Sequence, residues 1–304
     1  MDADRFSCVR AKLGAAPPLI PIRTAIRSTD AGTTSTSRTD ATDDRYLSTA
    51  SLFHVFGAIN SGFDHGGPNQ AQTSWTITGT RANGKTFSLR RDNRWADQFD
   101  AAVDPALEVA VAEDTLLFNE SEPVRITKVD YAATLSSGYD QETLLRRLVA
   151  VNGGALKQRG SVTVKRGDKL RVRAVLRPYR STATRSVEYT LTVPKTAKKG
   201  EPLSVELTAG DAGEADTGQD GDSGAEEMSC LLQPGVGCSR RQTAEQNFDS
   251  VLQDLRCTPK NNALTVALNH RSESRPDQAP LKSVTKLRKH VVTGEVDPID
   301  VTVR

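Results

Sequence analysis

The sequence predicts a mainly β protein, and three observations support this class. Apolar and polar residues alternate in several short segments between Val124 and Thr208, as in strands that bury one face. Turn residues separate these segments, such as the Gly-Asp pair at 167–168. Helical periodicity is confined to short stretches before and after this region. Together they indicate an immunoglobulin-like antiparallel β-sandwich flanked by small α+β segments.

Residues 1–45 are expected to be a disordered, Ser/Thr-rich N-terminus. The stretch "RSTDAGTTSTSRTDATDDR" contains almost no apolar side chain, so burial cannot offset its ordering entropy. The start of the chain also lacks the apolar core of a signal peptide, because the run Leu19–Ile22 is short and broken by proline. From the sequence as written we expect no export signal and a cytoplasmic location. No window is long and apolar enough to predict a membrane span.

Residues 46–123 are expected to form an α+β segment. In "TSWTITGTRANGKTFSLRR", Trp75 begins an alternation that resumes at Phe87 after an Asn-Gly pair, which predicts a β-hairpin. The following segment, "RWADQFDAAVDPALEVAVAEDTLLFNES", is helical in character. Pro105 after Asp104 is typical of a helix N-terminus, which predicts two helices that meet there.

Residues 124–209 carry the predicted sandwich. Its strands are expected in "VRITKVDYAATL", "TLLRRLVAV", "SVTVKRGDKLRVRAVLRPY", "SVEYTLTVP" and "PLSVELTAG". Residues 243–304 are expected to add a helix and closing strands. Thr243 and Gln246 predict a capping box for that helix, and Phe248, Leu252 and Leu255 follow at helical spacing.

Between them, residues 210–242 are expected to be an acidic, Gly-rich linker that ends in a cysteine loop. Seven residues separate Cys230 from Cys238, and no histidine is near, which argues against a metal site. A Cys230–Cys238 disulfide is the favoured interpretation, with Cys257 as the competing partner. Such a disulfide would indicate an oxidising compartment.

The linker also contains Gly-Asp-Ser-Gly around Ser223, a sequence that surrounds the nucleophile of chymotrypsin-like enzymes. A catalytic role would need His54 or His65 as the base and a carboxylate such as Asp92 or Asp104. However, the surrounding stretch has no apolar residue except alanine to fix its geometry, and two glutamates would destabilise an oxyanion. The favoured interpretation is therefore a linker residue, and a serine hydrolase remains the alternative.

No metal or cofactor is expected. The acidic residues of the linker do not match the spacing of a calcium-binding EF-hand loop, because Gly224 stands where a ligand is needed. The net charge of +2 provides no overall field for nucleic acid, which is not an expected partner.

From Leu52 onward the chain resembles the region that follows the peptidase domain in actinobacterial SpoIVB-type (sporulation stage IV B) serine peptidase proteins. The resemblance rests on the order of "LFHVFGAIN", "LRRDNRWADQFDAAVDPALEVA", "VRITKVDYAATLSSGYDQETLLRRLVAVNGG", "VTVKRGDKLRVRAVLRPYR" and "VVTGEVDPIDVTVR". The catalytic serine signature of that family is absent here, so no catalytic residue is carried over.

The resemblance implies a secreted or cell-envelope protein, in contrast to the missing export signal. We reconcile the two by expecting a truncated or separately encoded C-terminal half. Its implied role is a non-catalytic accessory or scaffold region, which contacts a protein or presents substrate to a peptidase domain in cis or in trans. A carbohydrate- or protein-binding β-sandwich module is a further alternative.

Overall fold

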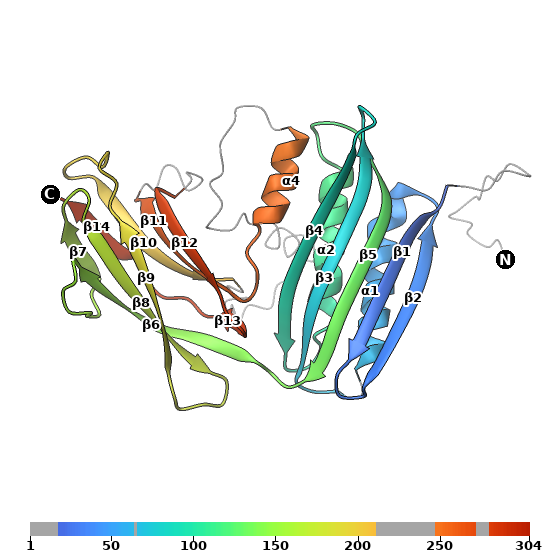
Figure 1. Cartoon of the computed structure of the whole chain (residues 1–304), viewed down its shortest axis with the longest axis horizontal. Helices are drawn as coiled ribbons and strands as arrows, with labels where there is room; N and C mark the ends of the chain where they lie inside the picture. The colour runs from blue at the N-terminus through green and yellow to red at the C-terminus, as the bar shows by residue number, and fades with distance from the viewer. Residues whose placement is uncertain (1–17, 64–65, 211–246, 272–279) are drawn as a thin grey trace, which may run out of the picture.

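The computed structural model describes residues 18–63, 66–210, 247–271 and 280–304. The fold is mainly β, with three sheets. One sheet and its helices form an N-terminal domain, and the other two sheets form a C-terminal domain beside it (Figure 1).

The N-terminal domain is a five-stranded sheet with helices on one face. The strand order is β2-β1-β5-β3-β4; β1 and β5 are parallel, and the other neighbours are antiparallel. Its strands are β1 (Ile20–Ser28), β2 (Thr33–Ala41), β3 (Asn69–Arg81), β4 (Thr86–Asp97) and β5 (Val124–Ser137). The helices α1 (Leu47–Gly62) and α2 (Val103–Leu117) lie behind the sheet in Figure 1, and a 3-10 helix, η1 (Asp44–Tyr46), precedes α1.

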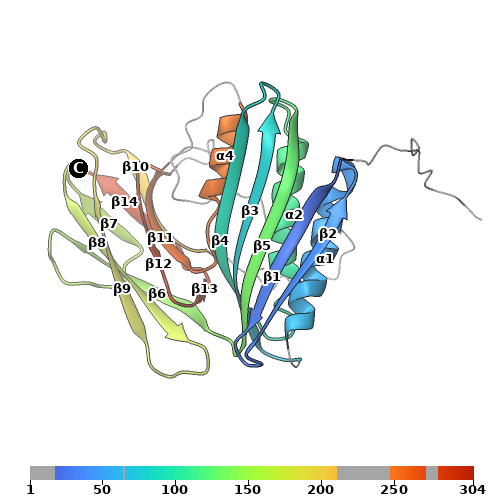
Figure 2. The same cartoon turned by 45° about the vertical axis from the view of Figure 1, so that its right-hand side comes forward.

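The two faces of this sheet differ because side chains alternate along each strand. On the helix side, Ile22, Trp75 and Leu135 are among the fully buried side chains of the core. On the other side, β1 exposes Arg23 and Arg27. No helix of the described residues covers this second face (Figure 2), which we call the open face.

The C-terminal domain packs two sheets around a second core. One sheet has the order β12-β11-β10-β14-β7 and the other β13-β6-β8-β9. The strands are β6 (Gln141–Val151), β7 (Ser161–Val164), β8 (Lys169–Pro178), β9 (Arg185–Thr192), β10 (Pro202–Ala209), β11 (Ala263–His270), β12 (Lys282–Leu287), β13 (Val291–Thr293) and β14 (Ile299–Val303). Buried residues of both sheets, such as Tyr189 and Val205, belong to one cluster.

The C-terminal half of the chain also completes the N-terminal core. Helix α4 (Phe248–Cys257) buries Phe248, Leu252 and Leu255 in that core, and the Phe248 ring lies 5.1 Å from the ring of Phe87 on β4. After α4 the chain continues into β11 of the sandwich. The two domains are therefore interlocked by the path of the chain.

Polar contacts hold the junction after α4 against β4. The buried guanidinium of Arg91 donates to the carbonyl oxygens of Thr258, at 2.7 Å, and Pro259. The backbone N–H of Asn261 donates to the side chain of Asn93 at 2.8 Å. The segment that joins α4 to β11 is thus fixed to the N-terminal sheet.

Several sequence predictions are confirmed. The hairpin around Trp75 and Phe87 is β3–β4, and Gly84 in its turn has a φ of +79°. A helix carries Phe248 and its apolar partners, but its N-cap is Asn247, which forms a capping box with Ser250. Thr243 and Gln246 lie outside the described residues.

Other predictions are wrong. Residues 20–41, predicted to be disordered, form β1 and β2; Ile20, Ile22 and Ile26 of β1 are buried, while β2 is polar because it lies at the sheet edge. The predicted sandwich at 124–209 loses its first strand, because β5 pairs with β1 and β3. Alternation identified that strand but carried no information about its partners.

The remaining corrections concern the sandwich and α2. The sandwich is not a separate unit from the C-terminal tail, since β11 to β14 complete its two sheets. It is not purely antiparallel, because β14 pairs with β7 and β13 with β6 in parallel. One helix, α2, replaces the two helices predicted to meet at Pro105, because β4 extends to Asp97 and takes up the first part of that segment.

Candidate binding groove on the open face of the N-terminal sheet

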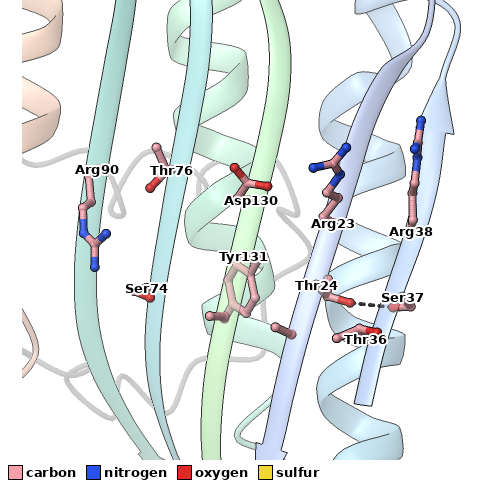
Figure 3. A pocket seen from close by; sticks show the side chains of 12 residues that line it. Arg23, Thr24, Thr36, Ser37, Arg38, Ser74, Thr76, Arg90, Asp130 and Tyr131 are labelled. Atoms are coloured by element: carbon pink, nitrogen blue, oxygen red, sulfur yellow. Dashed lines mark hydrogen bonds between the residues drawn. The ribbon is translucent and has the colours of Figure 1, made fainter. Parts of the chain in front are cut away.

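The strand register places polar side chains of the open face in rows that cross the sheet. One row runs through paired positions on all five strands: Arg38, Arg23, Asp130, Thr76 and Arg90. Figure 3 shows Arg23, Asp130, Thr76 and Arg90 beside one another on β1, β5, β3 and β4. A single line of side chains therefore joins both edges of the sheet.

The neighbouring row is built from small side chains on four strands. Thr36, Ala25, Ala132 and Ser74 are paired from β2 through β1 and β5 to β3. Because these side chains are short, the sheet is hollowed beside the taller row that contains Arg23 and Arg90. The hollow has a volume of about 670 Å³ and is lined by these small residues and by the row that contains Arg23 and Arg90.

A third row on the far side of the small residues is also basic. It contains Arg27 on β1 and Arg94 on β4, which are joined across the sheet by Thr134 and Gln72. Arg23 and Arg27 are four residues apart on β1, as Arg90 and Arg94 are on β4, so each pair spans about 13 Å of strand. The small row thus lies between Arg23 and Arg90 on one side and Arg27 and Arg94 on the other. We call this arrangement the arginine groove.

The carboxylates of this face already have basic partners. Asp40 pairs with Arg38 at 2.7 Å, Asp130 with Lys128 at 2.6 Å, and Asp92 with Lys260 at 2.6 Å. Within the described ranges, the four groove arginines Arg23, Arg27, Arg90 and Arg94 make no ion pair. The groove therefore presents four arginines without an ion-pair partner among the described residues, next to Asp130 and Asp92, whose carboxylates pair with Lys128 and Lys260.

Arginine is suited to recognise planar anions, because its guanidinium donates two parallel hydrogen bonds to a carboxylate or phosphate. Aromatic side chains are absent from the open-face positions of the five strands; Tyr131, which borders the hollow, points its ring into the core and is 2 % exposed. Binding of single-stranded nucleic acid relies on aromatic stacking, which this face does not offer.

The structure places His54 at the other face of the sheet, where α1 packs on β2. Its Nε2 lies 3.3 Å from the Ser37 hydroxyl and its Nδ1 lies 2.9 Å from the Thr39 hydroxyl. Burial lowers the pKa of His54, so the ring is mainly neutral near pH 7. No carboxylate is hydrogen-bonded to its Nδ1, and the Ser37 hydroxyl also contacts Thr24 at 2.5 Å. The cluster joins the helix to the edge strand and lacks the orienting carboxylate of a catalytic triad.

Of the proposed catalytic partners, the structure describes only His54, Asp92 and Asp104, and it places them on different elements. Ser223 and His65 lie outside the described residues. Asp92 is on β4, at the opposite edge of the sheet from β2, and Asp104 begins α2. Sequence order therefore gave no guide to which of these side chains are neighbours.

The disulfide stays a prediction, because Cys230 and Cys238 also lie outside the described residues. Cys257 is the last residue of α4, and the Gln253 amide lies 3.1 Å from its sulfur. In the part of the chain that the structure describes, no group of three or more His, Cys, Asp or Glu side chains is arranged to hold a metal ion.

Comparisons with known proteins add no relative to this description: no family model, no curated protein and no solved structure matches the chain. Among the described residues, no helix has the length and apolar character to cross a membrane.

Sequence analysis missed the arginine groove. Arg23 and Arg27 fall in the segment predicted to be disordered, and other members are spread over four further strands. Thr, Ser or Arg recurs at outward positions of successive strands, and this pattern predicts a polar sheet face. It does not predict which of these residues are paired across the strands.

Proposed function

We propose that the chain is a non-catalytic accessory protein that binds an extended acidic polypeptide segment in the arginine groove. The observation that carries this proposal is the row of small side chains between two pairs of arginines that have no ion-pair partner among the described residues. The proposal keeps the protein-contact role that the resemblance to SpoIVB-type accessory regions implies, including its secreted or cell-envelope setting, and assigns that role to the N-terminal sheet.

An extended peptide fits the spacing of the arginines. Side chains four residues apart on an extended chain point the same way and are separated by about 13 Å, the same distance as Arg23 from Arg27 along β1. Between β1 and β4 lie three strand spacings, or about 14 Å, so a peptide that crosses the strands meets a similar interval. Acidic residues with this spacing would reach two arginines at once.

The binding test uses fluorescence anisotropy with a fluorescein-labelled hexaglutamate peptide and the full chain. The double variant Arg23→Gln/Arg90→Gln should weaken binding by about a hundredfold, because each of the two lost charge-assisted contacts contributes about 1.5 kcal/mol. The matched control is Arg159→Gln/Arg166→Gln, which removes the same charge from exposed loops of the C-terminal domain. This control should bind as the parent does.

Three outcomes would refute the proposal. Equal losses in the groove variant and the control would show that binding follows net charge alone. Tight binding of a labelled oligothymidylate, without binding of hexaglutamate, would assign the face to nucleic acid. Labelling of the full chain by a fluorophosphonate probe, if lost in Ser223→Ala, would establish the hydrolase alternative instead.

A further inference from the structure

The outer edge of β2 is an unprotected strand edge. β2 pairs with β1 on one side, and in the described chain no other strand or loop makes a backbone hydrogen bond to it. Eight of its nine residues are at least partly exposed, and the strand contains no proline, no glycine and no bulge. Natural proteins usually protect such edges, because their free N–H and C=O groups are templates for another strand. Figure 2 shows β2 at the outer side of the sheet.

Apolar side chains are exposed on the helix that packs against this edge. His54 of α1 contacts β2 directly, which places the helix over the edge strand. Phe53 of α1 is 68% exposed, and Tyr46, in η1 immediately before α1, is 63% exposed. A side-chain carbon at Gly57, one turn beyond Phe53, would meet nothing within 4 Å, so the surface there is open.

We propose that β2 pairs with β2 of a second copy of this chain, in an antiparallel register about a two-fold axis at Ser37. In this register all nine residues of the strand are paired. Arg38 then faces Thr36 of the partner subunit, and Asp40 faces Thr34 of the partner subunit, so no like charges are opposed. A two-fold axis requires this kind of self-complementary surface.

Helix α1 lies beside this interface, because His54 contacts β2. Pairing through β2 places both copies of α1 on the same face of the joined sheet, because a two-fold axis normal to the sheet keeps each face on its own side. Strand pairing alone buries little area, whereas a stable dimer needs about 1,600 Å² in total, so side chains of the two α1 helices must supply part of the buried area. The open faces of the two sheets also become continuous. This inference does not depend on what the arginine groove binds.

The charge pattern provides a specific variant, Thr34→Asp. In the single chain Thr34 faces Arg27 on β1, so an aspartate there gains a basic neighbour and leaves the fold intact. In the dimer the same aspartate faces Asp40 of the partner subunit, twice by symmetry. Thr34→Asn, which has the same shape without the charge, is the matched control.

Analytical ultracentrifugation of the full chain over micromolar to submillimolar concentrations tests the proposal. The parent and Thr34→Asn should sediment as dimers, and Thr34→Asp should raise the dimer dissociation constant by about tenfold. A monomeric parent would overturn the proposal and leave the edge for a strand of another protein. A dimer equally strong in Thr34→Asp and Thr34→Asn would also overturn it.

Discussion

Truncation of Glu108 tests whether the buried polar cluster beneath the N-terminal sheet stabilises the domain. Glu108 extends from α2, and its carboxylate is 13% exposed. It accepts hydrogen bonds from Arg91 Nε at 2.6 Å, Asn93 Nδ2 at 2.8 Å and Trp75 Nε1 at 2.9 Å. Glu108→Ala leaves all three donors without this acceptor and leaves the charge of Arg91 buried.

The expected loss follows from these contacts. Removal of one partner of a buried ion pair costs about 3–5 kcal/mol, because the remaining charge stays desolvated. Arg91 keeps its two carbonyl acceptors at Thr258 and Pro259, so we expect the lower end, about 3 kcal/mol. Glu108→Gln retains an acceptor for some of the donors and should lose about half as much.

Urea unfolding followed by tryptophan fluorescence measures this loss. The chain has two tryptophans, Trp75 on β3 and Trp95 on β4, so the signal reports the N-terminal domain. The control is Asp92→Ala, which removes an exposed pair with Lys260 and should cost about 0–1 kcal/mol. If Glu108→Ala costs no more than Asp92→Ala, the cluster is not a stabilising element and the reasoning fails.

Two further variants probe the core of the same domain. Burial between α1 and α2 raises the pKa of Glu113 well above its usual value of 4.5, although Ser51 donates to it at 2.8 Å. The folded state therefore binds this proton more tightly than the unfolded state, and the associated stability is complete below pH 4.5 and falls as the pH rises. In Glu113→Gln the Tm should fall less between about pH 5 and pH 8 than it does in the parent. An equal fall in both proteins would contradict the raised pKa of Glu113. In Gly79→Ala the new carbon would lie 2.5 Å from the Arg125 carbonyl oxygen and 2.6 Å from the Phe87 ring, which should cost about 1–3 kcal/mol in urea unfolding; parent-like stability would show that the β-bulge there yields.

Local features of the fold were predictable from sequence, and long-range ones were not. The β3–β4 hairpin is specified by its own alternation and its Asn-Gly turn, and all of that information lies within 30 residues of sequence. β5 has an equally clear pattern, yet its partners are β3 and the distant β1, which lies in parallel register. An alternating pattern shows that one face of a strand is buried, but it does not show which strand is the neighbour.

The disorder predicted for residues 20–41 failed for a related reason. β2 has the composition of a disordered segment, because an edge strand exposes both of its faces and needs no apolar side chain of its own. Its order comes from nine paired positions with β1, whose isoleucines are buried under α1. Composition measures what a segment can bury by itself, whereas β2 is held by what its neighbour buries.

To predict the arginine groove from sequence, one would have to know that residues 20–28 form a strand and that this strand pairs with β5. Its rows exist only when β1 is a strand and when the parallel register aligns Arg23 with Asp130. By contrast, the motif around Ser223 was visible in the sequence because its residues are consecutive. Prediction from one sequence therefore favours linear motifs, while a binding surface on a sheet face is assembled from single residues of each strand.

The interlocked path of the chain determines how each of these experiments must be done. Phe248, Leu252 and Leu255 come from the C-terminal half but occupy the N-terminal core, and Arg91 holds the segment after them. An N-terminal fragment that ends after β5 would lack Phe248, which packs on Phe87. It would also remove the carbonyl oxygens of Thr258 and Pro259 that accept from Arg91. Loss of binding or of dimerisation in such a fragment would report its unfolding, so single substitutions in the full chain are needed to separate the groove from the edge of β2.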